Sequence, residues 1–145
     1  MTDRRQQADC IFCKIVRGEI PCSKVYEDDR VLAFMDINPL AEGHVLIIPK
    51  NHYETILEMP GEEAGALLTK APDLARAVLD GTGAEGLNVL QNNGACSGQE
   101  VGHVHVHLIP RRPGDNLGYR WNATQYAEGR MEAMRQAIVS ALTSS

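Results

Sequence analysis

Three of the five histidines in this 145-residue chain stand at positions 103, 105 and 107, separated only by valines. Side chains alternate between the two faces of a β-strand, so an extended segment here would place all three imidazoles on one face. Imidazole has the unperturbed pKa nearest neutrality and can act as nucleophile, acid, base or metal ligand. Packing alone does not explain three such rings in a row, and the segment therefore predicts a chemical site.

The remaining two histidines could belong to the same region. His44 begins an apolar segment that ends at Pro49, and His52 lies just beyond it. If this segment and the histidine strand share a sheet, all five imidazoles can lie close together. The alternative, that His44 and His52 are ordinary surface residues, stays open at this point.

The four cysteines comprise one pair and two isolated residues. Cys10 and Cys13 have the Cys-x-x-Cys spacing, whereas no role is assigned to Cys22 or Cys96. Outside a secretory context such a pair is more often metal-binding or redox-active than part of a disulfide framework. No strand precedes the pair, as a redox βαβ motif would require, so metal binding is favoured provided that two more ligands exist.

Composition and charge narrow the class of protein. Hydrophobic residues make up 43% of the chain and charged residues 23%, which is typical of a globular domain. A formal net charge of −5 argues against a nucleic-acid partner but is compatible with a pocket for a small nucleotide. No signal peptide and no membrane-spanning run are recognised, so a cytoplasmic protein without a membrane partner is expected.

Short strands and a few helices are predicted around these residues. Apolar spacing predicts a helix over 62–79, which Pro72 should kink or divide. Segment 11–16 is helical or irregular, and a further helix is expected from Tyr126 onward. The predicted strands are 24–27, 31–35, 43–49, 87–90 and 101–109. Few connections are long enough for parallel crossovers, so an antiparallel α+β fold is indicated.

The histidine segment resembles the signature of the histidine triad (HIT) superfamily. That signature is His-φ-His-φ-His-φ-φ, where φ is apolar, and residues 103–109 match every position. Further blocks are similar to bacterial members of the family and keep the family's order: 10–21, 25–28, 43–50 and 92–101. The resemblance implies a five-stranded antiparallel sheet with flanking helices and a homodimer. A flexible segment at 1–9 would precede a single HIT domain at 10–145.

For activity, the resemblance implies a hydrolase or transferase that works at the α-phosphate of purine nucleotide conjugates. A nucleotidyl-histidine would be the intermediate. Nucleoside phosphoramidates and dinucleoside polyphosphates are the competing substrate classes. Two alternatives remain, a nucleotide-binding adaptor with little catalysis and transfer of the nucleotidyl group to a phosphate acceptor.

The resemblance also implies roles for individual residues. His105 would be the nucleophile, because an unprotonated imidazole nitrogen can attack phosphorus directly. His107 and His44 would lie beside the α-phosphate. Asp36 matches the acceptor for the ribose hydroxyls, although an aspartate before Asn38 can equally cap a turn. The complete set of expected nucleotide-binding residues is Asp36, Ile37, Asn92, Ser97, Gly98 and Gln99.

A structural zinc site is the second implication, because some branches of the family carry one. Two cysteines and two histidines suit tetrahedral zinc, and the matching residues are Cys10, Cys13, His52 and His103. An unmetallated thiol pair is the alternative, and no organic cofactor is expected. One ion bound by all three triad histidines is disfavoured, because same-face residues lie roughly 7 Å apart along a strand. Trp121 could reach a partner subunit's active site or serve in packing.

Overall fold

The computed structural model describes residues 4–117 and 124–143, so Trp121 lies outside the described residues. Contacts divide the chain into two compact units, Met1–Asp115 and Asn116–Ser145. The first unit holds a sheet and its flanking helices, and the second contains helix α4 (Arg130–Thr143). Within the described part, no helix has the length and apolar character needed to cross a membrane. The single domain over 10–145 stays a prediction.

Five strands form one antiparallel sheet in the order β1-β2-β3-β5-β4. They are β1 (Lys24–Glu27), β2 (Val31–Met35), β3 (Val45–Pro49), β4 (Gly86–Gln91) and β5 (Val106–Arg111). The α+β class and the five-stranded sheet are thereby confirmed. β3 and β5 are neighbours in the sheet, with Leu46 opposite His107, so the strand that follows His44 lies beside the histidine segment.

The histidine strand is shorter than the predicted 101–109. β5 begins only at Val106, because the backbone N–H of Val104 donates to the carbonyl of Tyr53 at 2.8 Å and not to β3. The predicted alternation of faces is kept. Val104, Val106 and Leu108 belong to the apolar cluster that faces the long helices, and the histidines point to the other face.

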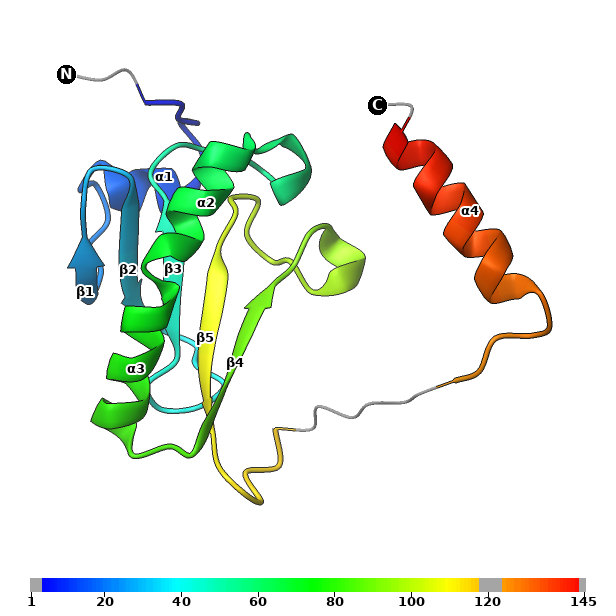
Figure 1. Cartoon of the computed structure of the whole chain (residues 1–145). Helices are drawn as coiled ribbons and strands as arrows, with labels where there is room; N and C mark the ends of the chain where they lie inside the picture. Colours follow the sequence, from blue (N-terminus) through cyan, green and yellow to red (C-terminus); the bar gives the residue numbers. More distant parts are fainter. Residues whose placement is uncertain (1–3, 118–123, 144–145) are drawn as a thin grey trace. The chain divides into compact units, whose positions relative to one another are not determined.

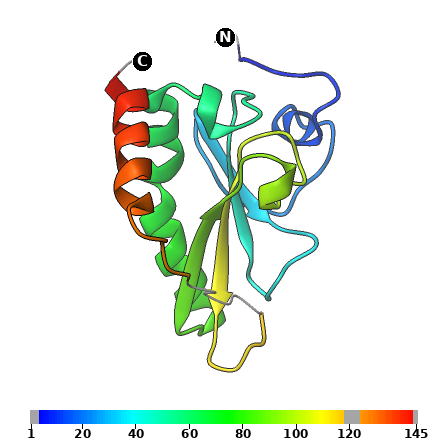
Figure 2. The same cartoon turned by 90° about the vertical axis from the view of Figure 1, so that its right-hand side faces the viewer.

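Helices cover both faces of the sheet. α2 (Gly61–Thr69) and α3 (Ala71–Thr82) lie along one face, and α1 (Ile11–Val16) lies against the other (Figures 1 and 2). The predicted helix over 62–79 is divided, since Pro72 occupies the first turn of α3, where its missing N–H costs nothing. Two short 3-10 helices, η1 (Ile56–Glu58) and η2 (Ala95–Ser97), lie in the connections.

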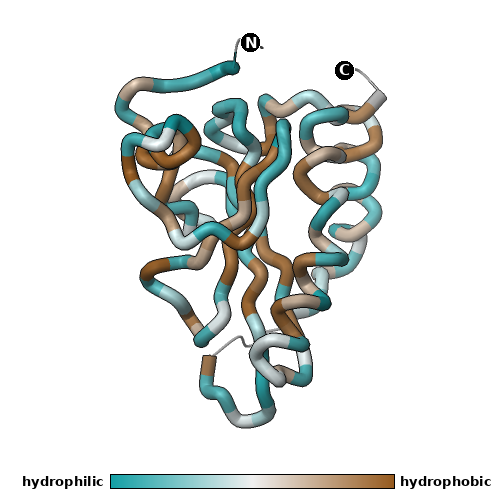
Figure 3. Tube along the Cα trace, turned by 90° about the vertical axis from the view of Figure 1, so that its left-hand side faces the viewer, coloured by the Kyte–Doolittle hydropathy of each residue, from teal (hydrophilic) through white to brown (hydrophobic). Residues whose placement is uncertain are grey.

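Each face of the sheet has its own apolar core. The larger cluster joins β2, β3 and β5 to α2 and α3 and includes Ile47 and Leu67. The smaller cluster joins the opposite face to α1, where the rings of Phe12 and Phe34 meet edge to face at 5.6 Å. The central strands are correspondingly the most apolar part of the trace (Figure 3).

The described part of the N-terminal segment is bound to the residues that follow β3, and the expected flexibility of 1–9 stays a prediction. The N–H of Arg5 donates to Asn51 Oδ1 at 2.8 Å, and its carbonyl accepts from the N–H of His52. Gln6 Nε2 donates to the carbonyl of Lys50 at 2.6 Å. These are polar contacts between distant residues, which local sequence pattern does not reveal.

Gly43 shapes the turn that leads to His44. Its φ is +97°, in the region that favours glycine, and an added Cβ would collide with the methyl group of Thr82 at the end of α3. We therefore expect Gly43→Ala to lower the free energy of unfolding by about 1–3 kcal/mol, measured by urea denaturation. Gly61→Ala is the matched control, because nothing lies within 4 Å of its added Cβ. Equal effects of the two substitutions would contradict this account.

Candidate active site and metal site

A cavity of about 500 Å³ lies on the α1 side of the sheet. Apolar side chains from α1 and β2 form much of its wall, and His44, His105 and His107 also line it. Two carboxylates, Asp36 and Glu100, face it, but no lysine or arginine lines it among the residues that the structure describes. The cavity is therefore a largely apolar pocket that ends on a histidine cluster, and its described lining contributes carboxylates but neither lysine nor arginine.

The tautomer of His105 follows from one hydrogen bond. Its Nδ1 lies 2.8 Å from the carbonyl oxygen of His103. A carbonyl oxygen can only accept, so Nδ1 carries the proton and the lone pair of neutral His105 is on Nε2. The ring is 6% exposed and borders the cavity. This arrangement places a nitrogen with a free lone pair at the wall of the cavity.

The tautomers of His44 and His107 follow from a chain of hydrogen bonds that begins at Leu40. The N–H of Leu40 donates to His44 Nδ1 at 3.1 Å, so the proton of neutral His44 is on Nε2. That nitrogen lies 2.9 Å from His107 Nδ1 and donates to it, which leaves the proton of His107 on Nε2. The chain of hydrogen bonds thus makes His107 Nε2 a donor.

Burial lowers the pKa of both His44 and His107, which favours their uncharged rings at neutral pH. Desolvation, reinforced by His105 and His44, lowers the pKa of His107 from its ordinary 6.5 to about 4. Burial likewise lowers the pKa of His44, although the carboxylate of Asp36 acts in the opposite direction. Neutral rings are what the donor and acceptor assignments require.

Ligand atoms of Asp36, His44 and His107 also lie within 4.8 Å of one another. Asp36 Oδ2 is 3.5 Å from His44 Nε2. Because Leu40 already donates to the other nitrogen of His44, Nε2 carries a proton and has no lone pair for a metal. This group is better suited to relaying hydrogen bonds than to binding an ion.

The expected nucleotide-binding residues divide between the cavity and its supporting loop. Asp36, Ile37, Asn92 and Gly98 line the cavity. Asp36 Oδ1 also accepts from the N–H of Asn38 at 2.8 Å, so the turn-capping role is present as well.

Ser97 and Gln99 do not line the cavity. Ser97 Oγ donates to the carbonyl of Gly94 at 2.8 Å. Gln99 Oε1 accepts from the Gly94 N–H, and its Nε2 donates to the carbonyls of Glu54 and Val101. Their polar atoms thus hold the η2 loop in this structure, and their expected role as phosphate donors stays a prediction.

Several cavity residues were not predicted from the sequence. Ile11 and Ile15 project from α1 into the lining, as does Phe12, and Glu100 follows the η2 loop. The i, i+4 spacing of the two isoleucines was a usable signal of a helix face. Glu100 carried no such signal, since its position depends on the loop.

The four predicted metal ligands do come together. Their ligand atoms all lie within 4.8 Å of one another. Cys10 Sγ is 3.4 Å from His103 Nδ1, Cys13 Sγ is 3.4 Å from His52 Nδ1, and the two Nδ1 atoms are 3.1 Å apart. Tetrahedral zinc with ordinary bond lengths has S···N edges of about 3.5 Å and N···N edges of about 3.3 Å. The side chains therefore fit a zinc ion closely.

Neighbouring groups orient these ligands. His103 Nε2 donates to the carbonyl of Pro49 at 2.9 Å, so its Nδ1 lone pair points into the cluster. Cys10 caps α1 and accepts the N–H of Cys13 on its sulfur, and Cys13 Sγ accepts from the Gln7 N–H. Burial raises the pKa of the Cys13 thiol and lowers that of His103 to about 4.

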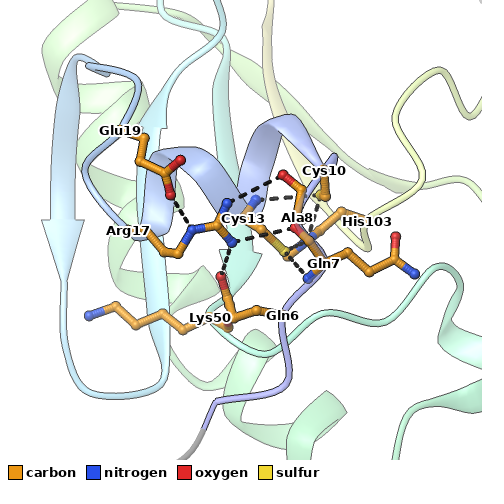
Figure 4. Close-up of polar contacts among 9 residues, drawn as sticks. All are labelled: Gln6, Gln7, Ala8, Cys10, Cys13, Arg17, Glu19, Lys50 and His103. Atoms are coloured by element: carbon orange, nitrogen blue, oxygen red, sulfur yellow. Dashed lines mark hydrogen bonds and ion pairs between the residues drawn. The ribbon is translucent and has the colours of Figure 1, made fainter.

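Arg17 holds the N-terminal segment over the cysteines. Its guanidinium contacts the Gln6 side chain and the carbonyls of Gln7 and Ala8, while Glu19 binds its Nε (Figure 4). The N–H of Gln7 is thereby kept near Cys13. Residues before the Cys-x-x-Cys pair are thus part of the cluster's support.

Comparison with known proteins identifies the family. A model of the HIT domain matches residues 17–114. An adenosine 5'-monophosphoramidase of Schizosaccharomyces pombe is 41% identical over 133 residues, 90% of this chain and 96% of that protein. An adenylylsulfatase of Arabidopsis thaliana is 50% identical over 111 residues, 77% of this chain but 56% of that protein. The chain belongs to the HIT family.

Solved structures agree with this assignment. A Streptococcus mutans protein has a TM-score of 0.91 at 42% identity, with 98% of this chain and 93% of that chain covered. A zinc-bound histidine triad family protein of Mycobacterium smegmatis has a TM-score of 0.73 at 36% identity, covering 94% and 96%. The predicted HIT-like fold is confirmed.

The low pKa of His107 makes stability depend on pH. Between about 4 and 6.5 the unfolded chain binds a proton at this residue that the folded chain does not. The free energy of unfolding should therefore be highest above pH 6.5 and fall as the pH is lowered, by about 1–2 kcal/mol from pH 7 to pH 5 for this group. His107→Asn should remove that part of the fall in urea denaturation. Identical pH dependence in both proteins would contradict the assignment.

Proposed function

We propose that the protein is a hydrolase that acts at the α-phosphate of purine nucleotide conjugates through a nucleotidyl-histidine intermediate on His105. The observation that carries the proposal is the His105–His103 hydrogen bond, which leaves Nε2 unprotonated beside the cavity. Membership of the HIT family and the phosphoramidase relatives support it.

In the first step, the lone pair of His105 Nε2 forms a bond to phosphorus while the bond to the leaving group breaks. The leaving amine takes up one proton from solvent as it departs. Water then attacks the same phosphorus, gives one proton back to solvent and releases the nucleotide, and the neutral His105 ring is regenerated. A donor aimed at the charge that develops on the phosphoryl oxygens lowers the barrier of both steps. His107 Nε2 would be that donor, held by His44.

The charge of the cavity favours phosphoramidates among the possible substrates. A polyphosphate or sulfate leaving group carries negative charge, and arginine or lysine is the usual partner of such anions. With Asp36 assigned to the ribose, the described lining offers Glu100 and no lysine or arginine to a leaving group, which suits a neutral or cationic amine. Nucleoside phosphoramidates are thus preferred to dinucleoside polyphosphates.

The binding roles of the lining residues are proposed on the same basis. Asp36 would accept the ribose hydroxyls, with Ile37 and Asn92 beside the nucleoside and the N–H of Gly98 near the phosphate. The protein would act as a cytoplasmic homodimer without nucleic-acid or membrane partners. A nucleotide-binding adaptor with little catalysis is the competing function, and intact His44, His105 and His107 argue against it.

Incubation with adenosine 5′-phosphoramidate and with diadenosine tetraphosphate tests this function. The wild type should release AMP faster from the phosphoramidate. His105→Asn should lose at least about 10³-fold in kcat while still binding AMP, because it removes the nucleophile and keeps the pocket. AMP binding without turnover of any substrate by the wild type would establish the adaptor instead.

We further propose that Cys10, Cys13, His52 and His103 hold one structural zinc ion. The matching tetrahedral distances and the ring of supporting hydrogen bonds favour this assignment, and the zinc-bound Mycobacterium smegmatis relative is consistent with it. A closed set of four protein ligands stabilises the fold and leaves no open position for chemistry.

Elemental analysis of the purified protein should find about one zinc per chain. Cys10→Ala should bind little zinc and melt several degrees lower, because structural metal binding contributes directly to folding free energy. Cys96→Ser is the matched control, since Cys96 is exposed on η2 and outside the cluster. Zinc well below one per chain in the wild type, or unchanged melting of Cys10→Ala, would refute the site.

A further inference from the structure

Helix α1 takes part in both sites at once. Cys10 and Cys13, at its N-terminal end, belong to the metal cluster. Ile11, Phe12 and Ile15, on the same six-residue helix, line the nucleotide cavity. A shift of the two cysteines would therefore also move the α1 residues that line the cavity.

Phe12 is the residue through which the two sites touch. Its ring meets that of His103 edge to face at 5.8 Å between centroids, and that of His105 at 5.2 Å. Phe34 closes the third side at 5.6 Å, and Phe12 is only 6% exposed. The Phe12 ring thus lies between His103, a candidate metal ligand, and His105, the proposed nucleophile.

The backbone bond alone does not fix the plane of the His105 ring. That bond places Nδ1 near the carbonyl of His103 and leaves the ring free to tilt about it. Edge-to-face packing restricts the tilt, since aromatic pairs have preferred orientations. The ring of His107, 4.8 Å away, borders the other side.

We propose that Phe12 is a positioning residue that couples the metal cluster to His105, so that metal binding at Cys10 and Cys13 orders the nucleophile and raises nucleotide affinity. The inference rests on the metal binding proposed above. With the cysteines held, α1 presses Phe12 against His105. Without metal, the helix end and the ring gain freedom, and binding a nucleotide must order them again.

The coupling can be measured without catalysis. Wild-type protein is stripped with a chelator under reducing conditions and reloaded with one equivalent of zinc, and the ring resonances of His105 are followed by NMR at fixed pH. We expect one sharp, shifted set with zinc and broadened signals without it. AMP affinity, measured by calorimetry, should be about tenfold tighter in the zinc form.

Phe12→Leu keeps an apolar side chain but removes the ring edge. It should still bind one zinc, yet its His105 resonances should stay broad, and zinc should change AMP affinity by less than about threefold. Phe12→Met serves as a second variant should the leucine protein not fold. Ile11→Ala is the matched control: it borders the cavity on the same helix, so it should weaken AMP binding equally in both metal states.

Three results would overturn the inference. If zinc changes neither the His105 resonances nor the AMP affinity of the wild type, the two sites are independent. A full zinc response in Phe12→Leu would place the coupling in the His103 backbone instead. Zinc-dependent His105 resonances without AMP binding would refute the nucleotide function and leave the coupling intact, whereas failure of the wild type to take up zinc would remove both the metal site and this inference.

Discussion

The hydrogen bond from His105 Nδ1 to the carbonyl of His103 is the constraint on which the rest of the site depends. It joins residues two apart in the chain, in the segment just before β5 begins at Val106. Its consequence extends further, because a carbonyl cannot donate and the lone pair must lie on Nε2. The sheet, the pocket and the neighbouring histidines are useful to the chemistry only once this nitrogen is free.

Burial of the histidine rings is the second physical feature on which the site depends. His103 and His105 pack against Phe12 of α1, and desolvation lowers the pKa values of His44 and His107. Neutral rings can each donate and accept once, which is what the chain from Leu40 through His44 to His107 uses. Burial also lowers the pKa of His103, and its hydrogen bond to the carbonyl of Pro49 leaves the Nδ1 lone pair for a metal. One physical effect thus prepares two different sites.

Much of the fold and of the site could be predicted from the sequence, since it rests on periodicity and spacing. Alternation of His and Val predicts one reactive face and one core face, and the structure agrees. Pro72 predicts a kinked or divided helix, and the structure has two helices there. The start of β5 could not be predicted, because Val104 pairs with Tyr53 in a distant segment. The hydrogen bonds of Ser97 and Gln99 to the carbonyls of Gly94 and Glu54 likewise follow from no local sequence pattern.

By itself, the sequence determined which chemical groups are available: three imidazoles on one face, two more histidines and a cysteine pair. These depend on residue type and on the two-residue period of a strand, which are local properties. Only the tertiary structure decided which of these groups belong to the metal cluster and which to the cavity. Folding brings His52 and His103 to the cysteines and His44 to His107, and it places Phe12 between the two sets. Such partitions depend on long-range packing, where a few ångströms separate a ligand from a hydrogen-bond donor.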